Sequence, residues 1–435
     1  MTTIRDVKAR EILDSRGNPT VEVDIILKDG VFGRASVPSG ASIGSKESLE
    51  LRDNDPTRYG GMGVKKSLHN IMREIAPRIK GLCVNNQNHI DNLMIELDGT
   101  PDRSKLGGNT ILAVSLATAH ASAKSRKLPL FKNLHNSTPK ILPTPMFNIL
   151  NGGKHALNST DVQEFMVVPA GLTSFSDALR AGSEIFHSLK RLLSERKLST
   201  TVGDEGGFAL SNTSNELAIE LILHSIENAG YSPGKQCYIA IDVAASELTV
   251  NKGKTYRISN EQKDITSYNM IQMYESWVSN YPIISIEDGL DENDWEGWVE
   301  LASKLANKVQ LVGDDIYATR VELLSDGIRR NASNAILVKP NQIGTITETI
   351  EIIETAASAE WGTIVSHRSG ETEDTTIADI AVAAAAKQIK AGAPSRGERT
   401  AKYNRLLRIE EFLGSEAIFA GCTPYIQFLK KGCHV

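Results

Sequence analysis

The chain has 435 residues, which is too long for one ordinary hydrophobic core and predicts two domains. Its 48 lysines and arginines are balanced by 53 acidic residues, and the net charge of -5 without a basic block argues against nucleic acid or an anionic membrane as main partner. Four scattered cysteines lack the spacing of a zinc site. Because the charged N-terminus has no apolar signal segment and no run of about 18 apolar residues occurs, a cytoplasmic protein is expected.

Residues 1–135 are predicted to form a small α+β domain. The segment TVEVDIILKDGVFGRASV alternates apolar and acidic residues before an Asp29-Gly30 turn, which is typical of a β-hairpin with one buried face. Helical spacing of apolar residues from Val64, and an Ala- and Ser-rich stretch over 109–125, predict helices. The proline-containing polar segment HNSTPKILPTP is the expected connection to the second domain.

Residues 140–421 contain short apolar runs that stop on charged residues. Five runs stop at Asp242, Glu287, Asp314, Lys339 and His367, and the last four of these residues are 27, 25 and 28 positions apart. That spacing fits one strand, one helix and two loops of a parallel α/β repeat. With further runs over 141–150, 164–170, 200–207 and 387–394, the pattern predicts a (β/α)₈ barrel, whose C-terminal rim is where active sites form. Residues 422–435 are left as a tail without a specific role.

Three of these strand ends carry carboxylates. Asp242, Glu287 and Asp314 would offer hard oxygen ligands, with no thiolate or paired histidines nearby, which favours Mg²⁺ or Mn²⁺ over zinc. Each acid alone is better explained as a cap at a strand end. Three acids in register, with Lys339 next along the chain, favour a metal site.

An acid and a base can be assigned beside the metal. Lys339 ends an apolar strand, where burial and a nearby cation would lower its pKa and make it a general base; the alternative is a plain ion pair with the acids. Glu205, in VGDEGGF, has Glu164 as a second candidate beside it. Since two close carboxylates cannot both ionise readily, one would hold a proton for a leaving hydroxyl, unless Asp204-Glu205 simply caps a turn. Together these groups describe elimination of water from a carbon acid.

The remaining candidates would bind an anion. Arg368 and Ser369, in SHRSGETED, offer a guanidinium and a hydroxyl suited to phosphate, and Lys390 adds a point charge. His155 follows two glycines and could reach the same site, although a lone histidine is as often structural. The loop PSGASIGSKE is expected to be a mobile cover, and it lacks the spacing of an ATP-type P-loop.

These motifs together resemble those of the enolase family. The resemblance runs from DSRGNPTVEV to RTAKYNRLLRIEE and is strongest in LNGGKHALN, QEFMVVPAG, VGDEGGFA, SIEDGLDENDW, LVGDD, KPNQIGT and SHRSGETED. It implies an enolase-type barrel, whose first strands depart from simple βα order, after an N-terminal α+β domain. It also implies the reversible dehydration of 2-phospho-D-glycerate to phosphoenolpyruvate in glycolysis and gluconeogenesis, with two Mg²⁺ ions per active site.

The same resemblance assigns roles by motif. Asp242, Glu287 and Asp314 would hold the tightly bound Mg²⁺, and Ser42 would bind the second. Lys339 would remove the C2 proton and Glu205 would assist departure of the C3 hydroxyl, with Glu164 beside it. The catalytic residues would then be Glu205, Lys339, Glu164 and His367. The substrate contacts would be His155, Gln163, Glu164, Glu287, Asp314, Lys339, Arg368, Ser369 and Lys390. A homodimer, or an octamer built from dimers, is implied without a choice between them.

Two alternatives remain open. A paralogue could act on another phospho- or phosphono-hydroxy acid, because one carbanion step can serve several substrates; Gln163, Arg368, Ser369 and Lys390 favour the ordinary substrate. The protein could instead be mainly a binding protein, for example a surface adhesin or a partner in an RNA-processing complex, since family members also occur at the cell surface. The complete acid, base and metal set argues against a catalytically inactive scaffold.

Overall fold

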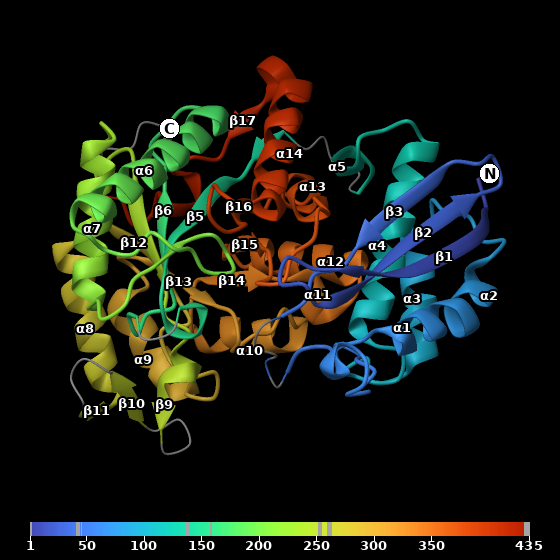
Figure 1. The fold of residues 1–435 in the computed structure, drawn as a ribbon, viewed down its shortest axis with the longest axis horizontal. Helices are drawn as coiled ribbons and strands as arrows, with labels where there is room; N and C mark the ends of the chain where they lie inside the picture. Colours follow the sequence, from blue (N-terminus) through green and yellow to red (C-terminus); the bar gives the residue numbers. More distant parts are fainter. Residues whose placement is uncertain are drawn as a thin grey trace.

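The computed structural model describes residues 2–40, 44, 46–134, 140–156, 159–250, 255–258 and 263–429. Figure 1 shows the N-terminal sheet and its helices, in blue, at one side of a larger barrel coloured from green to red. Among the described residues, no helix is long and apolar enough to cross a membrane.

The N-terminal part is a three-stranded antiparallel sheet covered by helices. Its strands are β1 (Ile4–Leu13), β2 (Pro19–Leu27) and β3 (Phe32–Ser36), and β2 with β3 forms the predicted hairpin. The helices are α1 (Lys65–Asn70), α2 (Ala76–Ile79), α3 (Gln87–Asp98), α4 (Gly108–Ser125) and α5 (Leu130–Asn133). A Cβ added at Gly33 of β3 would lie 2.1 Å from the backbone nitrogen of Ala121 in α4. The small residues of α4 therefore let helix and sheet touch almost backbone to backbone.

Eight strands close into a barrel, as predicted. In ring order they are β16 (Lys387–Lys390), β15 (Gly362–Ser366), β14 (Ala335–Val338), β13 (Gln310–Gly313), β12 (Ile283–Glu287), β8 (Tyr238–Asp242), β6 (Glu164–Val168) and β5 (Thr144–Asn151), which pairs back to β16. Strand β6 is antiparallel to both of its neighbours, whereas the other pairs in the ring are parallel. The departure from simple βα order that the resemblance implies is therefore present at the start of the barrel.

Helices surround this ring. They are α6 (Phe175–Glu195), α7 (Asn215–Asn228), α8 (Ser267–Asn280), α9 (Trp295–Leu305), α10 (Val321–Arg330), α11 (Pro340–Ile343), α12 (Ile346–Ser358), α13 (Thr376–Ala383) and α14 (Gly397–Leu413). Three short strands, β9 (Thr249–Val250), β10 (Thr255–Ile258) and β11 (Lys263–Ile265), form a separate small sheet. A two-stranded pair joins β4 (Ile141–Leu142) to β17 (Ile418–Phe419).

One predicted strand is absent from the ring. The run over 200–207 is predicted to be a barrel strand, but most of it is a loop that leads into the two-residue strand β7 (Phe208–Ala209), which pairs with β5 outside the ring. Gly203 and Gly207 leave room for the side-chain amide of Asn151, because a Cβ at either position would lie 2.4 or 2.5 Å from it. The glycines shape a loop around a polar side chain, and too few apolar residues remain for a strand buried on both faces.

The C-terminal tail closes the base of the barrel. Every second apolar side chain along the barrel strands belongs to a core that is separate from the core between the strands and the helices. Cys422 and Tyr425 of the tail are part of this separate core. Tyr425, in the short helix η6 (Thr423–Tyr425), is fully buried. The described part of the tail, residues 422–429, thus has a packing role that the sequence did not reveal.

Candidate active site

The charged residues predicted at strand ends lie at one rim of the barrel. Asp242, Glu287 and Lys390 are the last residues of their strands, and Asp314, Lys339 and His367 directly follow theirs. Because β6 runs in the opposite direction, its first residue, Glu164, reaches the same rim and pairs in register with Asp242.

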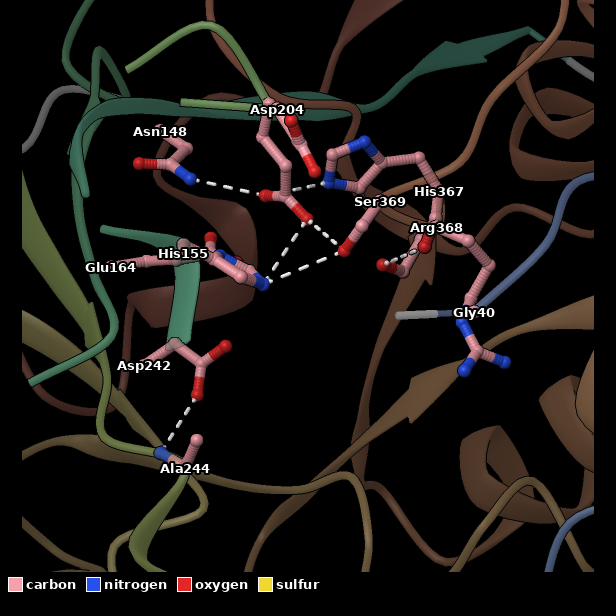
Figure 2. Close-up of polar contacts among 12 residues, drawn as sticks. Gly40, Asn148, His155, Glu164, Asp204, Asp242, Ala244, His367, Arg368 and Ser369 are labelled. Carbon is pink, nitrogen blue, oxygen red and sulfur yellow. Dashed lines mark hydrogen bonds and ion pairs between the residues drawn. The ribbon is translucent and has the colours of Figure 1, made fainter. Parts of the chain in front are cut away.

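A cavity opens at this rim. Among the described residues it is lined by Glu47, His155, Gln163, Glu164, Glu205, Asp242, Ala244, Glu247, Asp288, Asp314, Asp315, Lys339, Ser366, His367, Arg368, Ser369 and Lys390. Of the predicted site residues, Glu287 does not line the cavity but contacts Lys390 directly. Ser42 lies outside the described residues. Figure 2 shows His155, Glu164, Asp242, His367 and Ser369 projecting toward this common space.

Lys390 is the centre of a buried ionic cluster. Its Nζ donates to Asp242 Oδ2 and Glu287 Oε1, each at 2.9 Å, and lies 3.2 Å from Glu164 Oε2. Burial lowers the pKa of Lys390, but Asp242, Glu164 and Glu287 raise it well above its ordinary value. Lys390 therefore favours its charged form and balances these carboxylates.

Lys339 differs from the expectation in its ionisation. Its ammonium donates to Asp314 Oδ2, and its side chain, which directly follows β14, is 14% exposed. Burial lowers the pKa of Lys339, but Asp314 and Glu47 raise it further, so that the net pKa lies above the ordinary value. Burial by itself therefore does not lower the pKa of Lys339, because the strand-end acids surround the ammonium; the expected lowering relies on a nearby cation as well.

Negative charge is in excess at the rim. Eight acidic side chains line the cavity against two lysines and one arginine among the described residues. Glu287 Oε2 is buried and has no hydrogen-bond partner within the described part of the chain. Burial together with Asp242 raises the pKa of Glu287 well above its usual range. An added cation would relieve this repulsion and satisfy that oxygen, so the residues fit a divalent metal.

The closest groups of potential metal ligands are not the predicted trio. Within the described chain, ligand atoms lying within 4.8 Å of one another are found in two groups, His155 with Glu164 and Glu205, and Asp288 with Asp314 and Asp315. Lys390 stands between Asp242 and Glu287 instead. Of the three expected ligands, Asp314 alone belongs to one of these groups.

The pKa values of Glu164 and Glu205 are shifted in opposite directions. Glu205 accepts hydrogen bonds from Ser369 Oγ at 2.9 Å and Asn148 Nδ2 at 3.1 Å, and His367 Nε2 lies 3.4 Å from its Oε2 (Figure 2). Burial raises the pKa of Glu205, but the facing histidines hold it well below the usual range. Burial and the charge of Glu205 raise the pKa of Glu164 well above its usual value. These directions favour the protonated form for Glu164 and the ionised form for Glu205.

The predicted anion-binding residues Arg368, Ser369 and His155 line the same cavity as the acids. Arg368 donates to both oxygens of Glu47, at 2.7 and 3.2 Å, and to Asn341 Oδ1 at 3.1 Å. His155 Nε2 lies 3.5 Å from Ser369 Oγ, and His155 Nδ1 lies 3.5 Å from Glu164 Oε1. The histidine that could have been merely structural therefore belongs to the site.

Sequence reasoning missed several residues here. Asp288 accepts the backbone N–H groups of Asp314 and Asp315, at 2.8 and 2.9 Å, and so shapes the loop after β13. Its position directly after Glu287 was the available signal. Asn148 stands out as the polar residue in an apolar run, and Glu47 ends the loop predicted to be a cover.

Two family models cover nearly the whole chain. Residues 4–134 match the enolase N-terminal domain, and residues 139–427 match the enolase C-terminal TIM barrel domain. The chain belongs to the enolase family. As an enolase it is an enolase-superfamily lyase that binds a small-molecule substrate, and its acidic rim is compatible with a divalent metal.

Proposed function

We propose that this enolase catalyses the reversible dehydration of 2-phospho-D-glycerate to phosphoenolpyruvate in glycolysis and gluconeogenesis. The observation that supports this most is the placement of a base and an acid across one cavity. Lys339 follows β14 and Glu164 begins β6, and these strands are four positions apart in a ring of eight. A substrate between them would meet a lysine on one face and a carboxyl pair on the other.

The reaction assigns a step to each side. The Lys339 amine would take the proton from C2, and the electron pair left behind would move toward the substrate carboxylate. The pair of Glu205 and Glu164 would deliver a proton to the C3 hydroxyl, which leaves as water while the C2–C3 double bond forms. To act as the base, Lys339 must first release a proton, which its ion pair with Asp314 opposes.

A divalent metal would complete this site. Asp242, Glu287 and Asp314 would hold Mg²⁺, with Mn²⁺ as a substitute, and the ion would stabilise the negative charge that builds on the substrate carboxylate. A nearby cation would also lower the pKa of Lys339, opposing the acids that raise it now. A second Mg²⁺ would use Ser42.

Arg368, Ser369 and His155 would bind the phosphate, and Gln163 and Lys390 would contact the remainder of the substrate. Arg368 already makes a two-pronged contact with a carboxylate, which has the geometry suited to phosphate oxygens. Glu47 would have to yield part of this contact when substrate enters.

The first test is formation of phosphoenolpyruvate from 2-phosphoglycerate, followed by absorbance. We expect product with Mg²⁺, none after chelation, and recovery when Mg²⁺ is restored in excess. Folded protein that forms no product with Mg²⁺ would contradict the proposal. A panel of other phospho- and phosphono-hydroxy acids assayed in parallel would then identify a paralogue, and inactivity on all of them would favour a binding protein.

A second test separates the base from the acid. Exchange of the C2 proton with deuterated water should disappear in Lys339→Met. It should persist in Glu205→Gln, where dehydration is lost. Equal exchange in both variants would show that Lys339 is not the base.

The same proposal includes a cytoplasmic homodimer, or an octamer of dimers. Family membership supports it, and light scattering on the purified protein measures it directly. A monomer at assay concentrations that retains full activity would contradict this part alone.

A further inference from the structure

Arg399 is a fully buried arginine to which the proposed reaction assigns no role. It lies in the first turn of α14, and its side chain has no exposed surface. Burying a guanidinium is costly unless its N–H groups find acceptors. The acceptors of Arg399 are His367 Nδ1 at 2.5 Å and the carbonyl oxygens of Arg368 at 2.6 Å, Ser369 at 2.5 Å and Asp204 at 3.1 Å.

These acceptors belong to two loops of the site. One loop carries Glu205, directly after the Asp204 carbonyl, and the other carries His367 together with Arg368 and Ser369. Gly392 provides the necessary space, since a Cβ there would lie 2.8 Å from Arg399 Cδ and 2.9 Å from the Glu205 carbonyl oxygen. Arg399 therefore ties the loop of the acid to the loop of the anion-binding residues.

The contact with His367 also fixes where that histidine carries its proton. Arginine has only donors and remains charged, so Nδ1 of His367 must accept. In a neutral imidazole the proton is then on Nε2, the atom that lies 3.4 Å from Glu205 Oε2. His367 thus offers Glu205 a donor and not a lone pair.

We propose that Arg399 is a positioning residue that locks His367 in its Nε2-protonated form, directed at Glu205, and holds together the two loops that carry them. The consequence for catalysis rests on the proposed function, because it matters only if Glu205 belongs to the acid pair. The protonation state of His367 does not depend on any substrate and can be tested without one.

The charges around His367 predict its response to pH. Burial lowers the pKa of His367 to about 4, Glu205 opposes this, and Arg399 reinforces it; Glu371 also faces the ring. Removing the arginine charge while both carboxylates stay should therefore raise the pKa of His367. Protonation of the ring would then begin at a higher pH than in the unaltered protein.

The direct test is long-range ¹H–¹⁵N correlation of the metal-free full chain labelled with ¹⁵N-histidine, with His367→Asn to assign its signals. We expect the unaltered protein to show a protonated Nε2 and an unprotonated Nδ1 at neutral pH. A protonated Nδ1 would overturn the proposal, and this result requires no variant of Arg399 to fold.

The variants supply the second test. In Arg399→Met we expect a mixture of tautomers and a raised His367 pKa. Arg399→Lys keeps the positive charge but has fewer N–H donors, so its tautomer ratio and His367 pKa should lie between those of the unaltered protein and Arg399→Met. Arg408→Met, on an exposed residue of the same helix, is the matched control and should leave the histidine spectrum unchanged. A variant that folds like the parent and keeps its tautomer and pKa would contradict the proposal.

Kinetics then test whether the contact between Arg399 and His367 affects the reaction. We expect kcat of Arg399→Met to fall by about a hundredfold, with a new ionisation on the acidic side of the pH profile and partial recovery in Arg399→Lys. A fall in kcat without the new ionisation would indicate a merely structural role. If the unaltered protein does not dehydrate 2-phosphoglycerate, the proposed function fails while the spectroscopic result still decides the tautomer.

Discussion

The two ends of the barrel are built on opposite principles. At the rim, buried acids outnumber bases, and Glu287 has an oxygen without a partner among the described residues. At the base, the tail inserts Tyr425 into an apolar core, and the side-chain amides of Gln310 and Gln388 bond each other at 2.9 and 3.0 Å. Repulsion at the rim is tolerated because this end of the barrel is where a ligand is to be bound. The opposite end contributes to stability and, within the described chain, carries no site residues.

The largest effect is expected at the rim. Lys339→Met should lower kcat by about a thousandfold, because it removes the proposed base. Steady-state dehydration kinetics on folded protein measure this, with Lys304→Met, an exposed position on α9, as the control. Activity equal to the control would show that Lys339 is only an ion-pair partner. The rim would then differ from the opposite end of the barrel in charge but not through this residue's part in catalysis.

Substitutions at the end of the barrel opposite the rim should change stability and not catalysis. Tyr425→Ala should lower the free energy of unfolding by about 3–5 kcal/mol, as removal of large buried aromatic side chains does. Urea unfolding gives this value, and Ile426→Ala, at a neighbour that is 52% exposed, should change it by less than about 0.5 kcal/mol. A matching loss of kcat in folded Tyr425→Ala would mean that the two ends are coupled.

A smaller change is expected when one rim acid is neutralised. Glu287→Gln should weaken divalent cation binding by at least about tenfold. It should also stabilise the metal-free protein, because the carboxyl whose ionised form burial and Asp242 disfavour is gone. Calorimetric Mg²⁺ titration and urea unfolding measure the two effects, with Glu296→Gln on the surface of α9 as the control. A less stable metal-free protein would indicate that Glu287 is held mainly by Lys390 and is not under repulsion.

The smallest effect is expected at the base. The hydroxyl of Tyr425 is buried and, among the described residues, has no hydrogen-bond partner. Tyr425→Phe should therefore leave the free energy of unfolding equal or higher, by up to about 1 kcal/mol. A clear loss of stability would show that this hydroxyl has a hydrogen-bond partner. The end of the barrel opposite the rim would then be held partly by polar contacts.

The sequence predicted the rim better than the details within it. Asp242, Glu287 and Lys339 were recognisable because each ends a run of apolar residues, and a parallel barrel brings such ends together. The ionisation of Lys339 and of the Glu164–Glu205 pair was not recognisable, because it depends on which charges lie within a few ångströms after folding. The strand expected at 200–207 failed because its glycines serve a loop.

Arg399 shows another limit. An arginine is normally expected to face solvent. The helical spacing of Arg399 to Tyr403 and Leu406 places it on the buried face of α14, but gives no sign of which partners it meets there. Its acceptors are chiefly backbone carbonyls of distant segments, which no pattern of side chains marks. The role of such a residue emerges only when the loops have been placed in space.

The reversed direction of β6 determines which segments of the chain supply residues to the site. In a simple repeat, each strand delivers one connection to the working end of the barrel. Here the chain visits that end twice between β5 and β8, first in the turn into β6 with His155 and Gln163, and again between α6 and α7 with Glu205. A simple repeat would also reach that end twice here, once after each strand, so the reversed strand changes where the second visit comes from and not how many there are. One half of the carboxyl pair therefore comes from a segment between two helices that belongs to no strand of the ring.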